Sequence, residues 1–157
     1  MRVYVVRHGD AAPPPGGGER ALTDHGFQDS HDAGRLLATE GFDFLLYSPK
    51  LRTRQTRDCI LSVAGDIASR EELSLLPPTT EQSVVDSIEA CGGESVVLVS
   101  HLPLVAELVG WFTTGDPRDY RLMGFPPAGI VALDMDVAGQ GMASQAWHAF
   151  PPEFVKQ

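Results

Sequence analysis

An arginine and a histidine, Arg7 and His8, close the apolar run that begins at Val3. A second arginine, Arg52, follows the apolar run that closes at Ser48, and a second histidine, His101, closes the most apolar run of the chain. A neutral imidazole can attack phosphorus, and guanidinium groups match phosphate oxygens in pairs. Two histidines and two arginines in this arrangement therefore indicate phosphoryl chemistry through a histidine.

These candidate residues stand where predicted strands end. Apolar and β-branched runs predict strands at residues 1–6, 42–48 and 95–101, and a helical pattern follows each of them. This alternation predicts a three-layer α/β/α fold with a mostly parallel central sheet. Ligands of such sheets bind beyond the carboxyl ends of the strands, so we expect the candidates to meet there.

The remaining elements complete an α/β chain without repeats or linkers. We expect loop residues from the end of the first strand through Glu19, a short strand at 72–76 and a terminal hairpin at 129–150. Helices are expected at 22–41 (with Thr23 as N-cap), 50–65, 79–93 and 103–112. A length of 157 residues suits a single domain spanning 1–157.

The helix at 50–65 offers several cations, and its periodicity selects one of them. Helical positions advance by about 100° per residue, so Arg52 shares a stripe with Thr56, Cys59, Ile60 and Val63 that should face the sheet. Lys50, Arg54 and Arg57 point away from that stripe and are expected in solvent. Arg52 is therefore the arginine predicted to enter the site.

Each candidate can be given a role. His8 is assigned the attack because Gly9 lets the loop bend and lets substrate approach. His8 must then be neutral, with one ring nitrogen bare and the other donating to a backbone carbonyl. Arg7 and Arg52 would hold the phosphoryl oxygens, and His101 would be the charged partner that stabilises the transition state.

Four motifs in this order give the sequence a resemblance to a known family. They are "RHG" at 7–9, "LTDHG" at 22–26, "SPKLRTRQT" at 48–56 and "VSHLPLV" at 99–105. The chain resembles the histidine phosphatase superfamily, and the "RHGDA" continuation, the "SHLPLV" segment and the short length resemble its SixA-like branch of small phosphohistidine phosphatases. The resemblance implies a phosphoglycerate-mutase-like fold without a large cap insertion.

The resemblance also implies a site and a substrate. Arg7, His8, Arg52 and His101 fall on the family's phosphate pocket, and His8 is the residue transiently phosphorylated; no cofactor and no metal ion are implied. Thr53 stands where the family usually has alanine. Glu81 and Asp10 are the candidates for a general acid, and a protonated phosphohistidine, which carries a good leaving group, needs that acid less than an ester does.

Composition limits the partners. Twelve basic and 21 acidic residues give a net charge of −9, which disfavours nucleic acid and anionic membranes. We expect the partner to be a phosphorylated protein, such as a histidine-containing phosphotransfer domain, or a small phosphate ester. Cys59 and Cys91 form no recognisable disulfide or metal motif, and the first predicted strand leaves no room for a leader before it, so a cytoplasmic protein is expected.

Other functions remain open at this stage. The chain could be a phosphatase of small phosphate esters, a phosphoryl mutase, or a phosphate- or phosphoprotein-binding module without turnover. A metal hydrolase would need ligands from among His8, Asp10, His25, His31 and His101, whose spacing is poor. Phe112, Phe125, Trp147 and Arg121 could shape the rim of the pocket, although core packing is the better expectation for the aromatic residues.

Overall fold

The computed structural model describes residues 1–120 and 124–157, and a six-stranded sheet forms its centre. The strand order is β5-β4-β6-β1-β7-β8. Their bounds are β1 Arg2–Arg7, β4 Phe44–Tyr47, β5 Ala68–Glu71, β6 Ser95–Ser100, β7 Ile130–Met135 and β8 Ala143–Ala149. Strands β5, β4, β6 and β1 run parallel, whereas β7 pairs antiparallel with both β1 and β8. The mostly parallel sheet and the terminal hairpin are thus confirmed.

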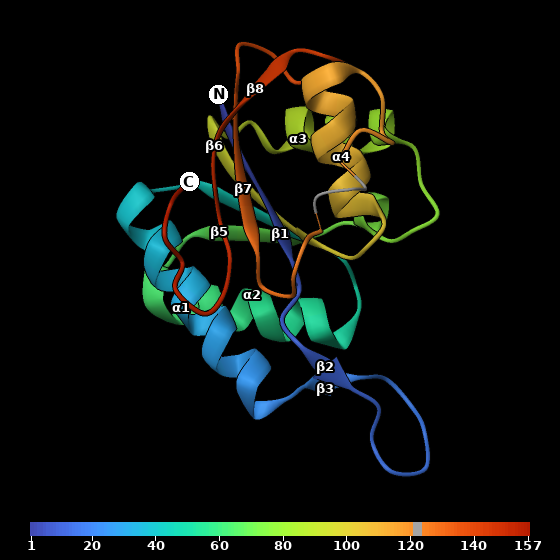
Figure 1. The fold of residues 1–157 in the computed structure, drawn as a ribbon, viewed down its shortest axis with the longest axis vertical. Helices are drawn as coiled ribbons and strands as arrows, with labels where there is room; N and C mark the ends of the chain where they lie inside the picture. Colours follow the sequence, from blue (N-terminus) through green and yellow to red (C-terminus); the bar gives the residue numbers. More distant parts are fainter. Residues whose placement is uncertain (121–123) are drawn as a thin grey trace.

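Helices cover both faces of the sheet, which confirms the three-layer prediction (Figure 1). Helices α1 (Asp24–Glu40) and α2 (Leu51–Ala64) lie on one face, and α3 (Glu81–Cys91) and α4 (Leu104–Thr114) lie on the other. The core residues alternate along β1, because Tyr4 and Val6 pack toward α1 and α2 while Val3 and Val5 pack toward α3 and α4. Among the described helices, none is long and apolar enough to cross a membrane.

Two glycines inside α1 have packing roles. A Cβ on Gly26 would lie 2.1 Å from the carbonyl oxygen of Asp10, and one on Gly34 would lie 2.9 Å from the Cα of Ile60 in α2. Both glycines therefore let the helix approach another backbone closely. The helix ends are as expected, since Thr23 accepts a hydrogen bond from the Gly26 amide at 3.0 Å and Gly41 follows the last turn.

Two local predictions were wrong. The strand expected at 72–76 is instead a 3-10 turn, η1 (Leu73–Leu75), in which Leu75 is buried and Leu73 is exposed, and the strand lies earlier at β5. β5 is polar because it is an edge strand, held by main-chain pairing with β4 and by Arg70 over the ring of Phe44. The loop after β1 also contains a small hairpin of β2 (Ala11–Ala12) and β3 (Ala21–Leu22).

Replacing Gly34 by alanine should destabilise the protein. The new methyl group would press against backbone atoms of Ile60 and Cys59, which cannot move aside as a side chain can. We expect a loss of about 1–3 kcal/mol in the free energy of unfolding despite the higher helix propensity of alanine. Urea denaturation measures the free energy of unfolding, with Thr39→Ala on the exposed side of α1 as the control. A Gly34→Ala variant more stable than the wild type would show that α1 and α2 can move apart without cost.

Candidate active site

The four predicted residues meet at the carboxyl edge of the parallel strands. Arg7 is the last residue of β1 and His8 follows it, whereas His101 follows directly after β6. Arg7 pairs in register with Ser100, so the two histidines leave neighbouring strands at the same level. Their ring centroids are 5.2 Å apart, and both rings are buried. The expectation that separate motifs converge at one edge is confirmed.

The contacts of His8 fix its tautomer. Its Nδ1 lies 2.7 Å from the carbonyl oxygen of Gly9, which can only accept, so Nδ1 carries the proton. Its Nε2 accepts from Nε of Arg52 at 3.2 Å and is therefore unprotonated. This is the arrangement expected for a nucleophile, with one ring nitrogen bare and the other donating to the backbone.

Neighbouring segments hold the His8 loop in place. The amide of His8 donates to the carbonyl of Ser100, and the amide of Gly9 donates to Oγ1 of Thr56 in α2, at 2.9 and 3.0 Å. A Cβ on Gly9 would lie 2.4 Å from Oγ of Ser30 in α1. Glycine is thus needed here for packing against α1, a reason that differs from the substrate access expected from the sequence.

His101 sits at the end of a buried chain of hydroxyl groups. Its Nε2 contacts Oγ of Ser48, which in turn lies 2.9 Å from Oγ1 of Thr53. The single proton of the Thr53 hydroxyl is donated to a carbonyl, since the carbonyl oxygens of Ser48 and Lys50 both lie at 2.7 Å. Ser48 must therefore donate to Thr53, and Nε2 of His101 must donate to Ser48. The neutral ring is then bare at Nδ1, which is buried and has no hydrogen-bond partner among the described residues.

The two arginines approach the histidines from different sides. Nη1 of Arg7 donates to the carbonyl of Phe125 at 2.8 Å, and its buried Nε has no partner within the described part of the chain. Arg52 is half-buried on the first turn of α2 and reaches His8. The stripe that selected Arg52 is correct for Thr56, Cys59 and Ile60, but Val63 is exposed and Thr53 is buried instead.

The other cations of α2 differ from one another. Arg54 is largely exposed, as predicted, and lies 3.9 Å from the carboxylate of Glu19. Arg57 stacks on the ring of Tyr47 at 4.3 Å, so its side chain is less solvated than expected. Lys50 is the N-cap residue of α2 but makes no side-chain capping bond, and Glu19 performs that function by accepting from the Leu51 amide at 2.6 Å.

Burial and the arginines keep both histidines uncharged. Desolvation, with Arg52 and Arg7 as lesser causes, lowers the pKa of His8 to about 4. Desolvation followed by Arg52 and His8 lowers the pKa of His101 to about 3. His101 is therefore neutral in the ligand-free protein, and the charged state predicted from the sequence concerns the complex with a phosphoryl group. A bound dianion would oppose these effects and favour a proton on the bare Nδ1.

Sequence reasoning missed Arg20. This exposed residue lies directly before β3, and its charge lowers the pKa values of Arg7, His8, Arg52 and His101. Arg20 therefore contributes to the positive potential of the pocket. In the structure Arg20 lies in the connection between β2 and β3. In the sequence its only signal is its place two residues before "LTDHG".

Within the described part of the chain, the general-acid candidates form no hydrogen bond with the two histidines. The carboxylate of Asp10 accepts from the Thr23 hydroxyl at 2.8 Å, and its charge partly offsets the lowering of the pKa of Arg7 that desolvation causes. Glu81 is the first residue of α3. Both residues stay predictions for the role of general acid.

The remaining sequence candidates lie elsewhere. His25 pairs with Asp29 at 3.1 Å, and His31 contacts Ser62 at 3.3 Å. Among the described residues, no group of three or more His, Cys, Asp or Glu side chains could hold a metal ion. The three aromatic candidates for the rim are buried in the core, as expected: Phe112, Phe125 and Trp147. Arg121 lies outside the described residues.

Comparison with known proteins agrees with this geometry. Residues 3–74 match the model of the histidine phosphatase superfamily (branch 1). The phosphohistidine phosphatase SixA of Escherichia coli is 30% identical over 148 residues, covering 90% of this chain and 89% of that protein. The chain belongs to the histidine phosphatase superfamily. Within this family of phosphatases it is a member of the SixA-like branch.

Solved structures give the same fold. The structure of the protein histidine phosphatase SixA complexed with tungstate has a TM-score of 0.79 at 27% identity and covers 94% of this chain and 96% of that one. The alpha-ribazole phosphatase from Shigella flexneri has a TM-score of 0.72 at 16% identity, covering 92% and 94%. The latter likeness concerns the fold alone. The expected phosphoglycerate-mutase-like architecture is confirmed.

The depressed pKa values predict how the histidines titrate. In the ligand-free protein, the ring ¹⁵N shifts of His8 and His101 should remain those of neutral imidazole from pH 8 down to about pH 5. An unfolded chain would take up these protons below pH ~6.5, so stability should fall as the pH drops from there toward pH 4. The urea-unfolded protein is the control, and pocket resonances that titrate at pH ~6.5 in the folded protein would contradict the prediction.

The hydroxyl chain predicts that Thr53 controls the tautomer of His101. In Thr53→Ala the Ser48 hydroxyl loses its acceptor and becomes free to donate to Nε2, which would move the ring proton to Nδ1. Long-range ¹H–¹⁵N NMR should show this change, and Thr53→Ser should restore the original tautomer. An unaltered tautomer in Thr53→Ala would mean that Ser48 orients His101 without Thr53.

Proposed function

We propose that this protein hydrolyses phosphohistidine on protein substrates through a phosphorylated His8. The observation that carries the proposal is the bare Nε2 of His8, which accepts a hydrogen bond from Arg52 while Nδ1 donates to the carbonyl of Gly9. The buried Nε of Arg7 and Nδ1 of His101 have no partner among the described residues, and phosphoryl oxygens would satisfy both. The SixA-like relatives support the same assignment.

The reaction proceeds in two displacements. Nε2 of His8 attacks phosphorus, a P–N bond to His8 forms, and the bond to the leaving group breaks. The hydrogen bond from Nδ1 to Gly9 holds the ring in the reactive tautomer and supports the positive charge that develops on it. Water then attacks the phosphorylated His8, and inorganic phosphate leaves.

Arg52 changes its partner during the first step. In the free pocket its Nε donates to the same nitrogen that must attack, so this hydrogen bond has to break. A phosphoryl oxygen between the two groups would accept the donor and release the lone pair of His8. Arg7 would bind a second oxygen, and His101, protonated at Nδ1 when the dianion is present, would bind a third.

A phosphoramidate substrate would need little help from a general acid. An alkoxide must receive a proton as it leaves, whereas the protonated imidazole of phosphohistidine leaves as a neutral ring. The hydrogen bond that the Asp10 carboxylate accepts from Thr23 supports a structural role for this candidate. We further propose a histidine-containing phosphotransfer domain as partner and the cytoplasm as location, which the free thiols of Cys59 and Cys91 support.

His8→Ala should abolish turnover and phosphoenzyme formation. We expect wild-type protein in chelator to hydrolyse a phosphohistidine-containing transfer domain at least ~100-fold faster, in kcat/KM, than a simple alkyl phosphate, because only the alkyl ester needs an acid. Rapid quench with ³²P-labelled substrate would trap the phosphoenzyme. Comparable rates on both substrates would favour a phosphatase of small esters, and binding without any phosphoenzyme would indicate a binding module.

A further inference from the structure

Positive charge that the phosphoryl group does not require surrounds the pocket. Among the lysines and arginines that the structure describes, only four form no ion pair with a carboxylate: Arg7, Arg20, Lys50 and Arg52. All four act on the pocket, as their effects on the pKa of His8 or His101 show. Two guanidinium groups suffice to neutralise a phosphoryl dianion, so Arg20 and Lys50 are in excess.

Helix α2 carries its cations where a helix tolerates them least. Lys50, Arg52 and Arg54 stand at its N-terminal end, where the helix dipole is positive, and its first turn has no acidic residue. Arg52 is accounted for by its contact with His8. Lys50 forms no ion pair among the described residues, and Arg54 has only the 3.9 Å pair with the exposed Glu19, so their unfavourable position points to a function outside the phosphate cage.

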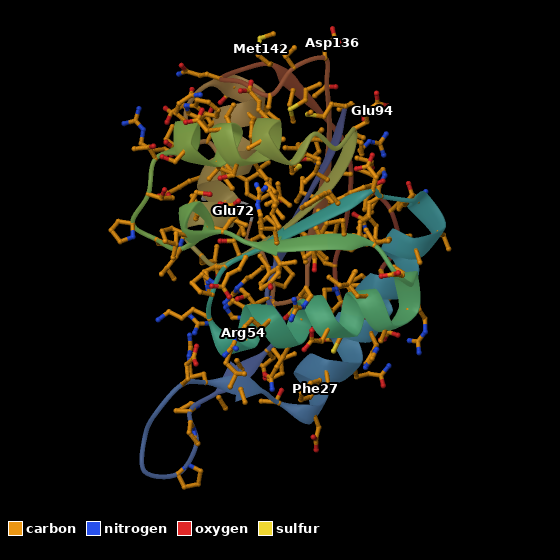
Figure 2. All side chains as sticks on the ribbon, turned by 180° about the vertical axis from the view of Figure 1, so that it is seen from behind. Phe27, Arg54, Glu72, Glu94, Asp136 and Met142 are labelled. Atoms are coloured by element: carbon orange, nitrogen blue, oxygen red, sulfur yellow. The ribbon has the colours of Figure 1, made fainter. Side chains whose placement is uncertain are left out.

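The location of these charges singles out one face of the molecule. Figure 2 shows Arg54 at the start of α2, beside the β2–β3 hairpin, and the acidic residues Glu94 and Asp136 at the opposite end. With a net charge of −9, the protein as a whole repels an acidic partner. An acidic surface would therefore be attracted at the mouth of the pocket and repelled elsewhere, which orients its approach.

We propose that Arg20, Lys50 and Arg54 form a docking rim for acidic side chains that flank the phosphohistidine of a protein substrate. This rests on the proposed function and adds the surface chemistry of the partner. Arg54 is available because, among the described carboxylates, it pairs only with the exposed Glu19, 3.9 Å away. Exposed Leu73 and Leu102, which follow β5 and β6 at the same sheet edge, offer apolar contacts beside the rim.

Two synthetic phosphohistidine peptides test the rim, one with glutamates and one with lysines on both sides of the phosphohistidine. Wild-type protein should prefer the glutamate peptide by about three- to tenfold in kcat/KM at low salt, and the preference should shrink as salt screens the charges. The double variant Lys50→Glu/Arg54→Glu should lose or reverse this ratio. Arg35→Glu, which changes an exposed arginine of α1 paired with Asp32, is the matched control and should keep the wild-type ratio.

The outcomes separate this inference from the proposed function. An equal rate on both peptides, or an unchanged ratio in the double variant, would overturn the docking rim while leaving the phosphohistidine phosphatase intact. If neither peptide is hydrolysed, the proposed function fails. The docking rim is then tested by the binding of the two peptides to the His8→Ala variant. Calorimetry must then show tighter binding of the glutamate peptide, and equal affinities would again refute it.

Discussion

Half-buried positive charge that forms no ion pair among the described residues is the constraint on which this pocket depends. Arg7 and Arg52 lie against two buried imidazoles, and within the described residues neither guanidinium forms an ion pair. Such an arrangement is unfavourable by itself, because desolvated cations of like charge repel each other. It stabilises an anion, and it adds to the desolvation that is the main cause of the lowered pKa of His8. Burial thus keeps the imidazole neutral, and the arginines favour both that state and the bound anion.

The fold sustains this unfavourable cluster through backbone contacts. The amides of His8 and Gly9 are held by Ser100 and Thr56, so the first motif is braced by β6 and by α2. The side chain of Gln55 in α2 in turn accepts a hydrogen bond from the amide of Leu22 at 2.7 Å and so holds β3 against α2. Each motif therefore positions its neighbour, which explains why residues distant in the sequence must occur together.

Sequence reasoning found the residues whose position follows from periodicity or from strand ends. Arg7, His8 and His101 end strands, and Arg52 lies on the buried stripe of α2. Sequence reasoning failed for the residues whose position depends on tertiary contacts. The polar edge strand β5 is held by pairing rather than by apolar side chains, and Arg20 reaches the pocket only because a hairpin folds back. Likewise, the closeness of Gly9 to Ser30 depends on how α1 packs.

The hydroxyl chain behind His101 shows how a small departure from the family pattern acquires meaning. Thr53 differs from alanine by a methyl and a hydroxyl group, and from the sequence alone its presence is a small change on the helix. In the structure its hydroxyl is buried, and counting protons along the chain leaves Nδ1 of His101 bare. This nitrogen can accept a proton as the dianion arrives and donate it to a phosphoryl oxygen. In the proposed reaction His101 is charged only while the phosphoryl group is bound, so the free pocket keeps its lower charge and the reacting one gains a donor.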